Sequence, residues 1–425
     1  MGIKNGVFSL QRVNRIQDDG QWSTDADVYL TPSPFRGSTW SKAYWCGGDD
    51  TEGYRQRFDF ASDTTTMTIA AYHPSVRTMN WVVERGAGAG NANYGFIAGG
   101  DAATPGGTTY AGSLVQRIDY ANDEDNSTYR GILTVGVRYN TAVGTQDHGY
   151  FCGGINSVYA PSPIYYSTIS RITYANDSNA VAKGNLNNGV TAGAATGNQS
   201  YGYFGGGSSN VPSPTAKRTW VDRIDYSNDT ATATPKGPLL VVRQLPGCTG
   251  NASYGYWAGG ASEPSTVATT DRVDYSNDTA TATPKGALST PTYAIAATGT
   301  ASYGYFGGGK SPSNCTTNDR LDYSSDTSAM VPKGQLVHAT AYSQAVGAQC
   351  WGMTTGTIQN NPDTIIRNEG GGSPETSMHG YWLCNPGSTV SRLDFTNDTQ
   401  NCSPKGDLIK TEHYMGATGN ANHGY

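Results

Sequence analysis

The stretch SYGYFGGG (200–207), followed by VDRIDYSNDTATATPKGPL (221–239), is the clearest copy of a unit that recurs along the chain. Near-identical second halves occur at 271–288 and 319–336, and weaker copies precede and follow them. Every copy has an Arg in the R-apolar-D/T-aromatic segment: Arg57, Arg117, Arg171, Arg223, Arg272, Arg320 and Arg392. Every copy also has an Asp in the next turn: Asp63, Asp123, Asp177, Asp229, Asp278, Asp326 and Asp398. The sequence therefore predicts seven structural repeats.

Four short strands are predicted in each repeat. Small residues such as GAATGN (193–198) suit an inner strand a near a crowded axis, and YGYFGGG and VDRIDY supply aromatic and β-branched bulk for strands b and c. The Asn/Asp turn leads into an outer strand d that ends in Pro-Lys-Gly. The repeat spacing runs from 48 residues (Arg272 to Arg320) to 72 residues (Arg320 to Arg392). These features predict an all-β propeller of four-stranded antiparallel blades.

The two ends of the repeat region predict how the ring closes. The segment YMGATGNANHGY (414–425) resembles a strand a with the beginning of a strand b, whereas 43–65 resembles strands b, c and d without an a. We therefore expect a seven-bladed propeller over 43–425, closed by the C-terminal strand joining the N-terminal blade. Residues 1–42 are expected to be an N-terminal docking arm, and 350–378 an insertion into the last repeat.

Composition excludes several classes of protein. Of 425 residues, 55 are Gly and only 15% are charged, which disfavours long helices. The net charge of −6 and the absence of basic runs argue against nucleic acid as a partner. Neither a signal-peptide core nor an apolar stretch long enough for a membrane span is present, so we expect no membrane insertion and no Sec export.

The search for chemistry favours a protein without catalytic residues, metal or cofactor. The six His residues lack metal-ligand spacing, and a residue that recurs seven times, such as the repeat Arg, is expected to pair structurally with carboxylates along the blade stack, as at Arg223 and Asp225. The acidic run NDEDNST could ligate Ca²⁺ through Asp123, Asp125 and Asn126, although a solvated turn is the favoured interpretation. Cys46 and Cys152 occupy a repeat position that elsewhere holds Ala or Gly, which predicts small buried thiols.

Loops of variable length predict a binding face. Between the Gly pair after strand b and the repeat Arg, the first six repeats have 8, 16, 16, 15, 11 and 10 residues, whereas the c–d turns scarcely vary. Variable loops on a rigid scaffold are typical of recognition sites. The candidate binding residues in these loops, suited to stacking on sugar rings or to a protein contact, are Tyr110, Tyr159, Tyr165, Tyr166, Lys217 and Trp220. Covering the blade ends is the alternative role for each of them.

The units resemble kelch repeats in their Gly pair after strand b and their R-aliphatic-D-Y strand c, although the usual strand d Trp is missing. More specifically, DRIDYSNDTATATPKG and YGYFGGG resemble the kelch-like repeats of structural and tail-fibre proteins of marine bacteriophages, especially those that infect cyanobacteria. This resemblance implies a virion protein without catalytic residues, assembled in the host cytoplasm and extracellular in the mature particle.

The expected function is therefore host attachment by a tail or fibre protein that contacts a host-surface glycan or protein. The N-terminal arm and the insertion 350–378 are expected to contact other virion proteins. A purely structural decoration or connector subunit is one alternative. A secreted or cell-surface adhesin or enzyme is another.

Overall fold

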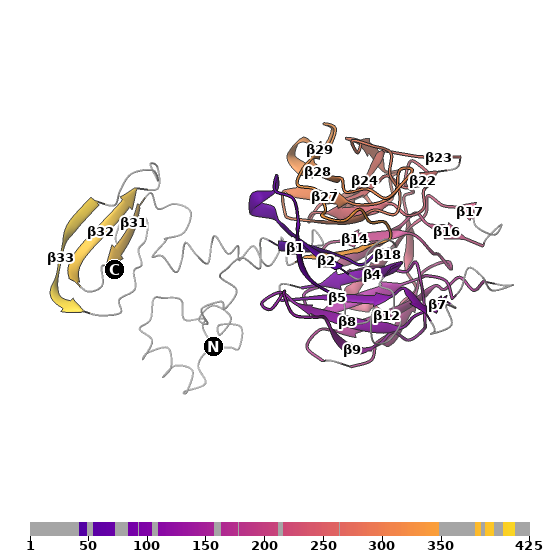
Figure 1. The fold of residues 1–425 in the computed structure, drawn as a ribbon, viewed down its shortest axis with the longest axis horizontal. Helices are drawn as coiled ribbons and strands as arrows, with labels where there is room; N and C mark the ends of the chain where they lie inside the picture. The colour runs from indigo at the N-terminus through magenta and orange to yellow at the C-terminus, as the bar shows by residue number, and fades with distance from the viewer. Residues whose placement is uncertain are drawn as a thin grey trace.

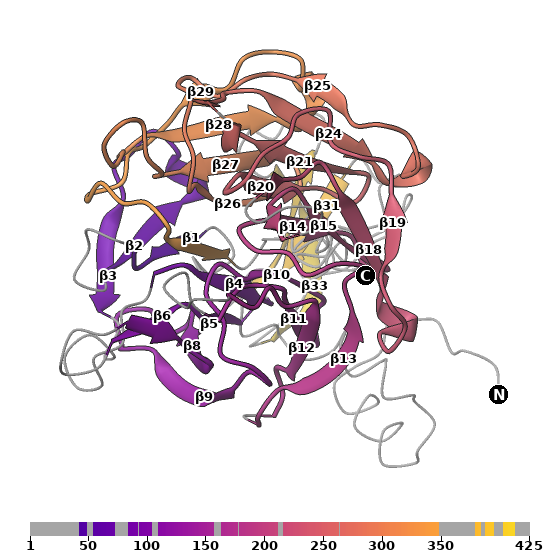
Figure 2. The ribbon, with the colours of Figure 1, turned by 90° about the vertical axis from the view of Figure 1, so that its right-hand side faces the viewer.

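Six four-stranded antiparallel sheets surround a common axis in the computed structural model and form a β-propeller (Figures 1 and 2). The predicted fold class, an all-β propeller of four-stranded antiparallel blades, is confirmed. The structure describes residues 42–48, 54–72, 84–91, 93–103, 109–156, 163–176, 178–210, 216–262 and 264–347, and the strands within 379–383, 387–394 and 403–412.

The four strands of each blade follow the predicted order a, b, c, d from the axis to the rim. Strands a are β4 (Gly86–Gly90), β10 (Thr141–Gly144), β14 (Ala194–Gly197), β20 (Gly247–Gly250), β26 (Ala296–Gly299) and β30 (Gln344–Gly347). Strands b are β1 (Lys42–Cys46), β5 (Tyr94–Gly99), β11 (His148–Cys152), β15 (Tyr201–Gly205), β21 (Tyr254–Ala258) and β27 (Tyr303–Gly307). Figure 2 shows several strands a gathered near the centre of the ring.

The outer half of each blade comes from the second part of the repeat. Strands c are β2 (Tyr54–Asp59), β8 (Leu114–Asp119), β12 (Thr168–Thr173), β18 (Val221–Asp225), β24 (Thr270–Asp274) and β28 (Asn318–Asp322). Strands d are β3 (Thr68–Tyr72), β9 (Thr128–Ile132), β13 (Val181–Asn185), β19 (Thr234–Lys236), β25 (Thr283–Lys285) and β29 (Val331–Pro332). We number the blades by the chain order of their strands b, so blade 1 is β30-β1-β2-β3 and blade 6 is β26-β27-β28-β29.

The turns follow the local chemistry of the repeat. Both glycines after strand b have positive φ in all six blades, for example 72° at Gly206 and 90° at Gly207, a conformation that side chains with a Cβ rarely adopt. After strand c, Asp225 accepts a hydrogen bond from the Ser227 backbone and caps the short 3₁₀ helix η2 (Tyr226–Asn228). Asp225 therefore stabilises its own turn, which corrects the expectation that it pairs along the blade stack.

The prediction of seven blades is wrong, because the ring closes after six. The closing strand is β30 and not the segment 414–425: β30 pairs antiparallel with β1, with Ala43 opposite Gly347. The seventh repeat instead forms a separate sheet of β31 (His379–Leu383), β32 (Gly387–Asp394) and β33 (Ser403–Glu412), which no described propeller strand joins (Figure 1). Residues 414–425 lie outside the described part of the chain.

The ring closes after six blades because of the length of the connection between β30 and β31. In blades 2 to 6 three residues connect strand a to strand b, as between Gly197 and Tyr201, so the two strands form a tight hairpin. After β30 the next strand begins only at His379, beyond the insertion 350–378. A long connection removes the local advantage of pairing β30 with β31. β30 therefore occupies the open inner edge of blade 1.

A closed ring of backbone hydrogen bonds surrounds the axis and confirms this count. The residue two positions before each strand a, or immediately before it in β4, has a left-handed φ between 54° and 58°. Its N–H donates to the carbonyl of the equivalent residue in the preceding blade over 2.5 to 3.1 Å. The six residues of this cycle, which we call the ring residues, are Arg85, Tyr139, Ala192, Leu245, Ala294 and Tyr342, and the Arg85 N–H donates to the Tyr342 carbonyl to close it.

Aromatic pairs fill all six interfaces between blades. A strand b ring contacts the aromatic residue that follows strand c of the next blade, with ring centroids 4.6 to 5.2 Å apart, and the two rings are stacked in five of the six pairs. Tyr203 and Tyr275 are one stacked example, whereas the rings of Tyr305 in blade 6 and Phe60 in blade 1 meet at a tilt of 40°. Such pairs add about 0.5–1.5 kcal/mol each to the free energy gained from burying their area.

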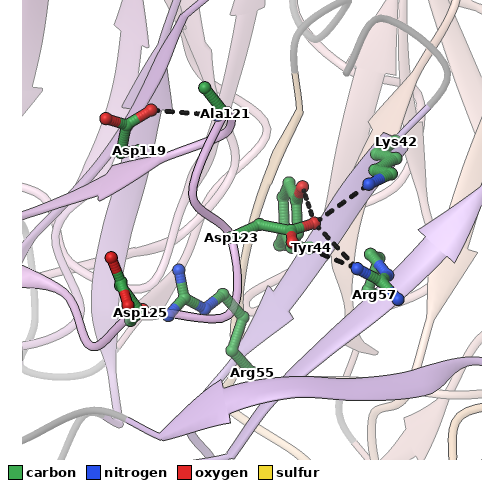
Figure 3. A network of polar contacts seen from close by, with 8 residues as sticks. All are labelled: Lys42, Tyr44, Arg55, Arg57, Asp119, Ala121, Asp123 and Asp125. Carbon is green, nitrogen blue, oxygen red and sulfur yellow. Dashed lines mark hydrogen bonds and ion pairs between the residues drawn. The ribbon is translucent and has the colours of Figure 1, made fainter. Parts of the chain in front are cut away.

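The repeat Arg joins a blade to the next one at five of the six interfaces among the described residues. Arg223 contacts the turn carboxylate of Asp278 at 2.7 Å, and Tyr203 and Lys236 contact the same carboxylate at 2.9 and 3.0 Å. The described equivalents are Arg57–Asp123, Arg171–Asp229, Arg272–Asp326 and Arg320–Asp63, the last of which closes the ring. Figure 3 shows the blade 1 version, in which Lys42, Tyr44 and Arg57 surround Asp123. Asp177 and the side chain of Arg392 lie outside the described part of the chain.

The Pro-Lys-Gly motif belongs to the same interface. The Gly237 N–H donates to the Asp278 carbonyl at 2.8 Å, beside the Lys236 ion pair. A Cβ on Gly237 would lie 1.9 Å from the Ala280 carbonyl oxygen, so the close approach of two backbones requires Gly here. Burial raises the pKa of the Asp278 carboxyl, but the bonds from Lys236 and Tyr203 and the charge of Arg223 outweigh it and lower this pKa below its usual value.

Candidate binding face

The variable segments between strands b and c project as hairpins from one face of the propeller (Figure 1). They contain the pairs β6 (Asp101–Ala103) with β7 (Thr109–Ala111), β16 (Ser208–Ser209) with β17 (Ala216–Lys217), and β22 (Ala261–Ser262) with β23 (Ser265–Thr266). Because strands a and c run away from this face, the links from strand d to the next strand a reach it too. We call it the loop face.

Bridges join these hairpins to the links around the axis. Ser208 at the base of one hairpin pairs with Thr191, which precedes the ring residue Ala192. The pairs Ile155–Arg138, Ala261–Gln244 and Lys310–Tyr293 repeat this contact in other blades. The hairpins and the centre of the loop face therefore form one continuous surface.

A cavity of about 80 Å³ lies on the axis at the centre of the loop face. We call it the axial mouth. Each of the six links contributes a ring residue and the residue after it: Arg85, Gly86, Tyr139, Asn140, Ala192, Gly193, Leu245, Pro246, Ala294, Ile295, Tyr342 and Ser343. The lining is asymmetric, because the polar and aromatic side chains come from three links and the aliphatic ones from the other three.

Arg85 and two tyrosines form the polar side of the axial mouth. The Arg85 guanidinium carbon lies 4.9 Å from the centre of the Tyr342 ring and 5.6 Å from that of Tyr139, and the two rings meet edge to face at 5.9 Å. Beside the mouth, Arg85 is paired with the carboxylates of Glu84 and Asp101. Arg138 also contacts Asp101, at 2.8 Å. Two guanidinium groups thus face two carboxylates.

The predicted loop residues that the structure describes lie in the segments between strands b and c and do not line the axial mouth. Tyr110 lies on β7 opposite Ala102, and Tyr165 pairs with Ile155 at the base of the blade 3 loop. Tyr166 is half-buried against the core between blades 2 and 3. Tyr159 lies outside the described part of the chain, as do the arm residues 1–41 and the insertion 350–378.

The remaining two predicted residues share the blade 4 hairpin. Lys217 on β17 pairs with Ser208, and Trp220 is half-buried with the Arg218 guanidinium 4.8 Å from its ring centre. The predicted residues therefore come from three adjacent blades.

Sequence reasoning missed the axial mouth. Its ring residues lie in links that the repeat motif does not cover. They share a backbone conformation but no residue type, so the sequence alone does not show that their positions are equivalent. The one available signal was position: each ring residue lies one or two places before a small-residue strand a.

A second polar position ties the links to the blades. The residue before the repeat Arg accepts a hydrogen bond from the link of the preceding blade, as Asp222 does from the Asn187 N–H at 2.9 Å. At this position Asp271 also has Arg243 at 3.1 Å. Burial raises the pKa of the Asp222 carboxyl to about 6. The hydrogen bond from the Asn187 N–H lowers this pKa, but by less than burial raises it.

The candidate calcium ligands have another role. The Asp123 carboxylate is occupied by Lys42, Tyr44 and Arg57, and the Asp125 carbonyl accepts from Arg55 (Figure 3). In the part of the chain that the structure describes, no group of three or more His, Cys, Asp or Glu side chains could hold a metal ion. No described helix is long and apolar enough to cross a membrane.

The cysteine prediction is confirmed at both repeat positions. Cys46 and Cys152 are unpaired and buried, at 0% and 1% exposure, and burial raises the pKa of each thiol. They act as small core residues.

These features define a six-bladed β-propeller whose axis opens on a face built from variable hairpins. Among solved structures, 468 chains are similar to it. One, described as "Structure of YjhT" and a kelch-repeat propeller, matches with a TM-score of 0.50 and 12% identity over 63% of this chain and 88% of that chain. At this identity the likeness concerns the fold alone. No family model and no curated protein matches the sequence.

Proposed function

We propose that the chain is a non-enzymatic binding protein whose loop face contacts a glycan or protein on the surface of a host cell. One observation carries this proposal: loops of different length, with bases bridged to the links around the axis, stand on six blades of nearly constant design. The blades supply rigidity, and the hairpins supply surfaces that differ from blade to blade.

The setting we propose is a bacteriophage virion, with the propeller on a tail or fibre. The resemblance of the repeats to those of marine phage structural proteins supports this setting. In the same proposal, the N-terminal arm and the insertion 350–378 attach the propeller to other virion proteins. Immunogold labelling of purified particles tests it: a few labels at the tail support attachment, and label spread over the head supports the decoration alternative.

The binding experiment uses fluorescently labelled full-length protein with candidate host cells and with their isolated surface glycans. Binding that saturates, and that excess unlabelled protein displaces, supports the proposal. Failure to bind both cells and glycans overturns the attachment function and leaves a purely structural role.

A matched pair of variants locates the contact. Trp220→Ala changes a half-buried hairpin residue on the loop face, whereas Tyr129→Ala changes an outer strand residue that is 56% exposed at the rim. We expect the first substitution to weaken cell binding and the second to leave it unchanged. Equal loss in both variants would contradict a role for the loop face.

A further inference from the structure

We propose that the axial mouth binds a single neutral sugar ring, the terminal residue of a surface glycan. This inference rests on the proposed function and deepens it, because it assigns the recognition of a ligand to a defined cavity on the loop face. Four observations carry it: the variable side chains of the ring residues, the partly exposed tyrosines, the balanced charge and the size of the cavity.

The side chains of the ring are not dictated by the fold. All six ring residues share one left-handed backbone conformation and one hydrogen-bond pattern, yet they are Arg, Tyr, Ala, Leu, Ala and Tyr. For residues other than Gly, this left-handed conformation costs roughly 1 kcal/mol or more in free energy. Elsewhere in the blades this chain uses Gly where φ is positive, as at Gly206 and Gly207. Identical backbones with different side chains are typical of positions that set specificity.

Aromatic surface is available on one side of the axial mouth. Tyr139 and Tyr342 are both half-exposed. The ring centroid of Tyr293 lies 6.5 Å from that of Tyr342, and the two rings meet edge to face. Opposite them lie Ala192, Leu245 and Ala294. A sugar ring has apolar C–H faces that stack on aromatic rings and a rim of hydroxyls, which fits a cavity with one aromatic and one aliphatic side.

The charges beside the axial mouth favour a neutral ligand. Arg85 and Arg138 are compensated by Glu84 and Asp101, so neither an anion nor a cation would find an uncompensated partner. Hydrogen-bonding capacity nevertheless remains: Arg85 Nε and Ser343 Oγ are buried without a hydrogen-bond partner among the described residues. A sugar hydroxyl can accept a hydrogen bond from the guanidinium and can donate one to the serine hydroxyl, so sugar hydroxyls match both groups.

The cavity size limits the ligand to one ring. A water needs ~10–15 Å³ of such space, so a cavity of about 80 Å³ holds roughly five to eight water-sized groups. This accommodates the edge of one monosaccharide with its hydroxyls and no second ring. The rest of a glycan would lie along the hairpins, because the links that form the mouth are bridged to the hairpin bases.

Ligand-observed NMR on the full-length protein tests this inference. The probes are glucose, galactose, mannose, rhamnose and N-acetylglucosamine, each as the methyl glycoside, with glucuronate as the anionic comparison. We expect at least one neutral glycoside to bind, and glucuronate to bind more weakly. Tyr342→Ala should weaken binding about tenfold through loss of its stacking face, and Tyr342→Phe should retain most of it. Tyr129→Ala at the rim is the matched control, and thermal unfolding shows whether each variant is folded.

The outcomes separate the two proposals. If the protein binds cells while none of the neutral glycosides binds it, or if their binding survives in folded Tyr342→Ala protein, the axial site is wrong and the attachment function stands. If a neutral glycoside binds and Tyr342→Ala weakens it, but cells are not bound, the axial site stands and the attachment function is wrong. Stronger binding of glucuronate than of every neutral glycoside overturns the choice of a neutral ligand.

Discussion

Closure of the ring by β30 makes a direct prediction about truncated chains. A chain that ends at Ala348 keeps β30 and should retain the complete propeller. A chain that ends at Ser343 lacks Gln344–Ala348 and therefore loses the inner strand of blade 1. The two chains differ by five residues, so their comparison isolates the closing strand from the seventh repeat.

The magnitude follows from what β30 buries. Val346 is fully buried and Ala345 is 8% exposed, so losing them costs about 2–4 kcal/mol in burial alone at the usual ~0.8 kcal/mol per CH₂ and ~1.5–3 kcal/mol per large aliphatic side chain. Losing the β1 ladder adds to this cost. At roughly 2–4 °C per kcal/mol, the shorter chain should unfold about 5–15 °C below the longer one.

The assay is thermal unfolding followed by far-UV circular dichroism, with light scattering to detect aggregation. The chain ending at Ala348 should unfold within about 2 °C of the propeller transition in the full chain, because it loses no propeller strand. Val346→Asp in the full chain, which places a charge in the same interface, should behave like the shorter chain. If the chain ending at Ala348 is as unstable as the one ending at Ser343, six-bladed closure is refuted.

Three further substitutions test the interfaces and the links. Gly237→Ala should destabilise the propeller by about 2–3 kcal/mol in urea unfolding, because the new Cβ would lie 1.9 Å from the Ala280 carbonyl oxygen; an effect below about 0.5 kcal/mol would contradict the required close approach. Ala294→Gly should cost about 1–2 kcal/mol less than Ala296→Gly, because the first position has φ of 57° and favours Gly, whereas the second lies in strand β26; equal costs would argue against the strained ring. Asp222 has a raised pKa of about 6, so its stabilising contribution is complete below the unfolded-state pKa near ~4 and is lost as the pH rises through about 6. Asp222→Asn should therefore gain about 1–3 kcal/mol in unfolding free energy relative to the native chain between pH 4 and pH 8, and a pH-independent difference would contradict the shift.

The blade could be predicted from the sequence because its determinants are local. The Gly pair, the Asx turn and the alternation in strands b and c act within a few residues, and they specify the same structure in each copy. The identity of the ion-pair partners could not be predicted in the same way. Arg223 has Asp225 two residues away but binds Asp278 in the next blade, because the nearer carboxylate caps its own turn.

The blade count and the axial mouth depend on distant parts of the chain. Counting repeats cannot show whether β30 pairs with β31 or with β1, since both partners carry the same kind of strand b sequence. The connection length decides it, and three-residue hairpins elsewhere make the long connection after β30 the exception. The axial mouth requires six links to meet at one point, and its residues Arg85, Tyr139 and Tyr342 share no side-chain pattern that a single sequence could reveal.

The antiparallel pairing of Ala43 with Gly347 places the first and last strands of the ring side by side and makes the two faces of the propeller different. β1 runs toward the loop face and β30 runs away from it, so the chain enters the ring at Lys42 and leaves it at Gly347 on the same side of blade 1. Both points lie at the end of the axis opposite the hairpins. A tether attached through either flanking segment would therefore pull from the back of the disc through neighbouring strands. Load applied in this way would pass into the ring through blade 1, at the end of the axis away from the hairpins.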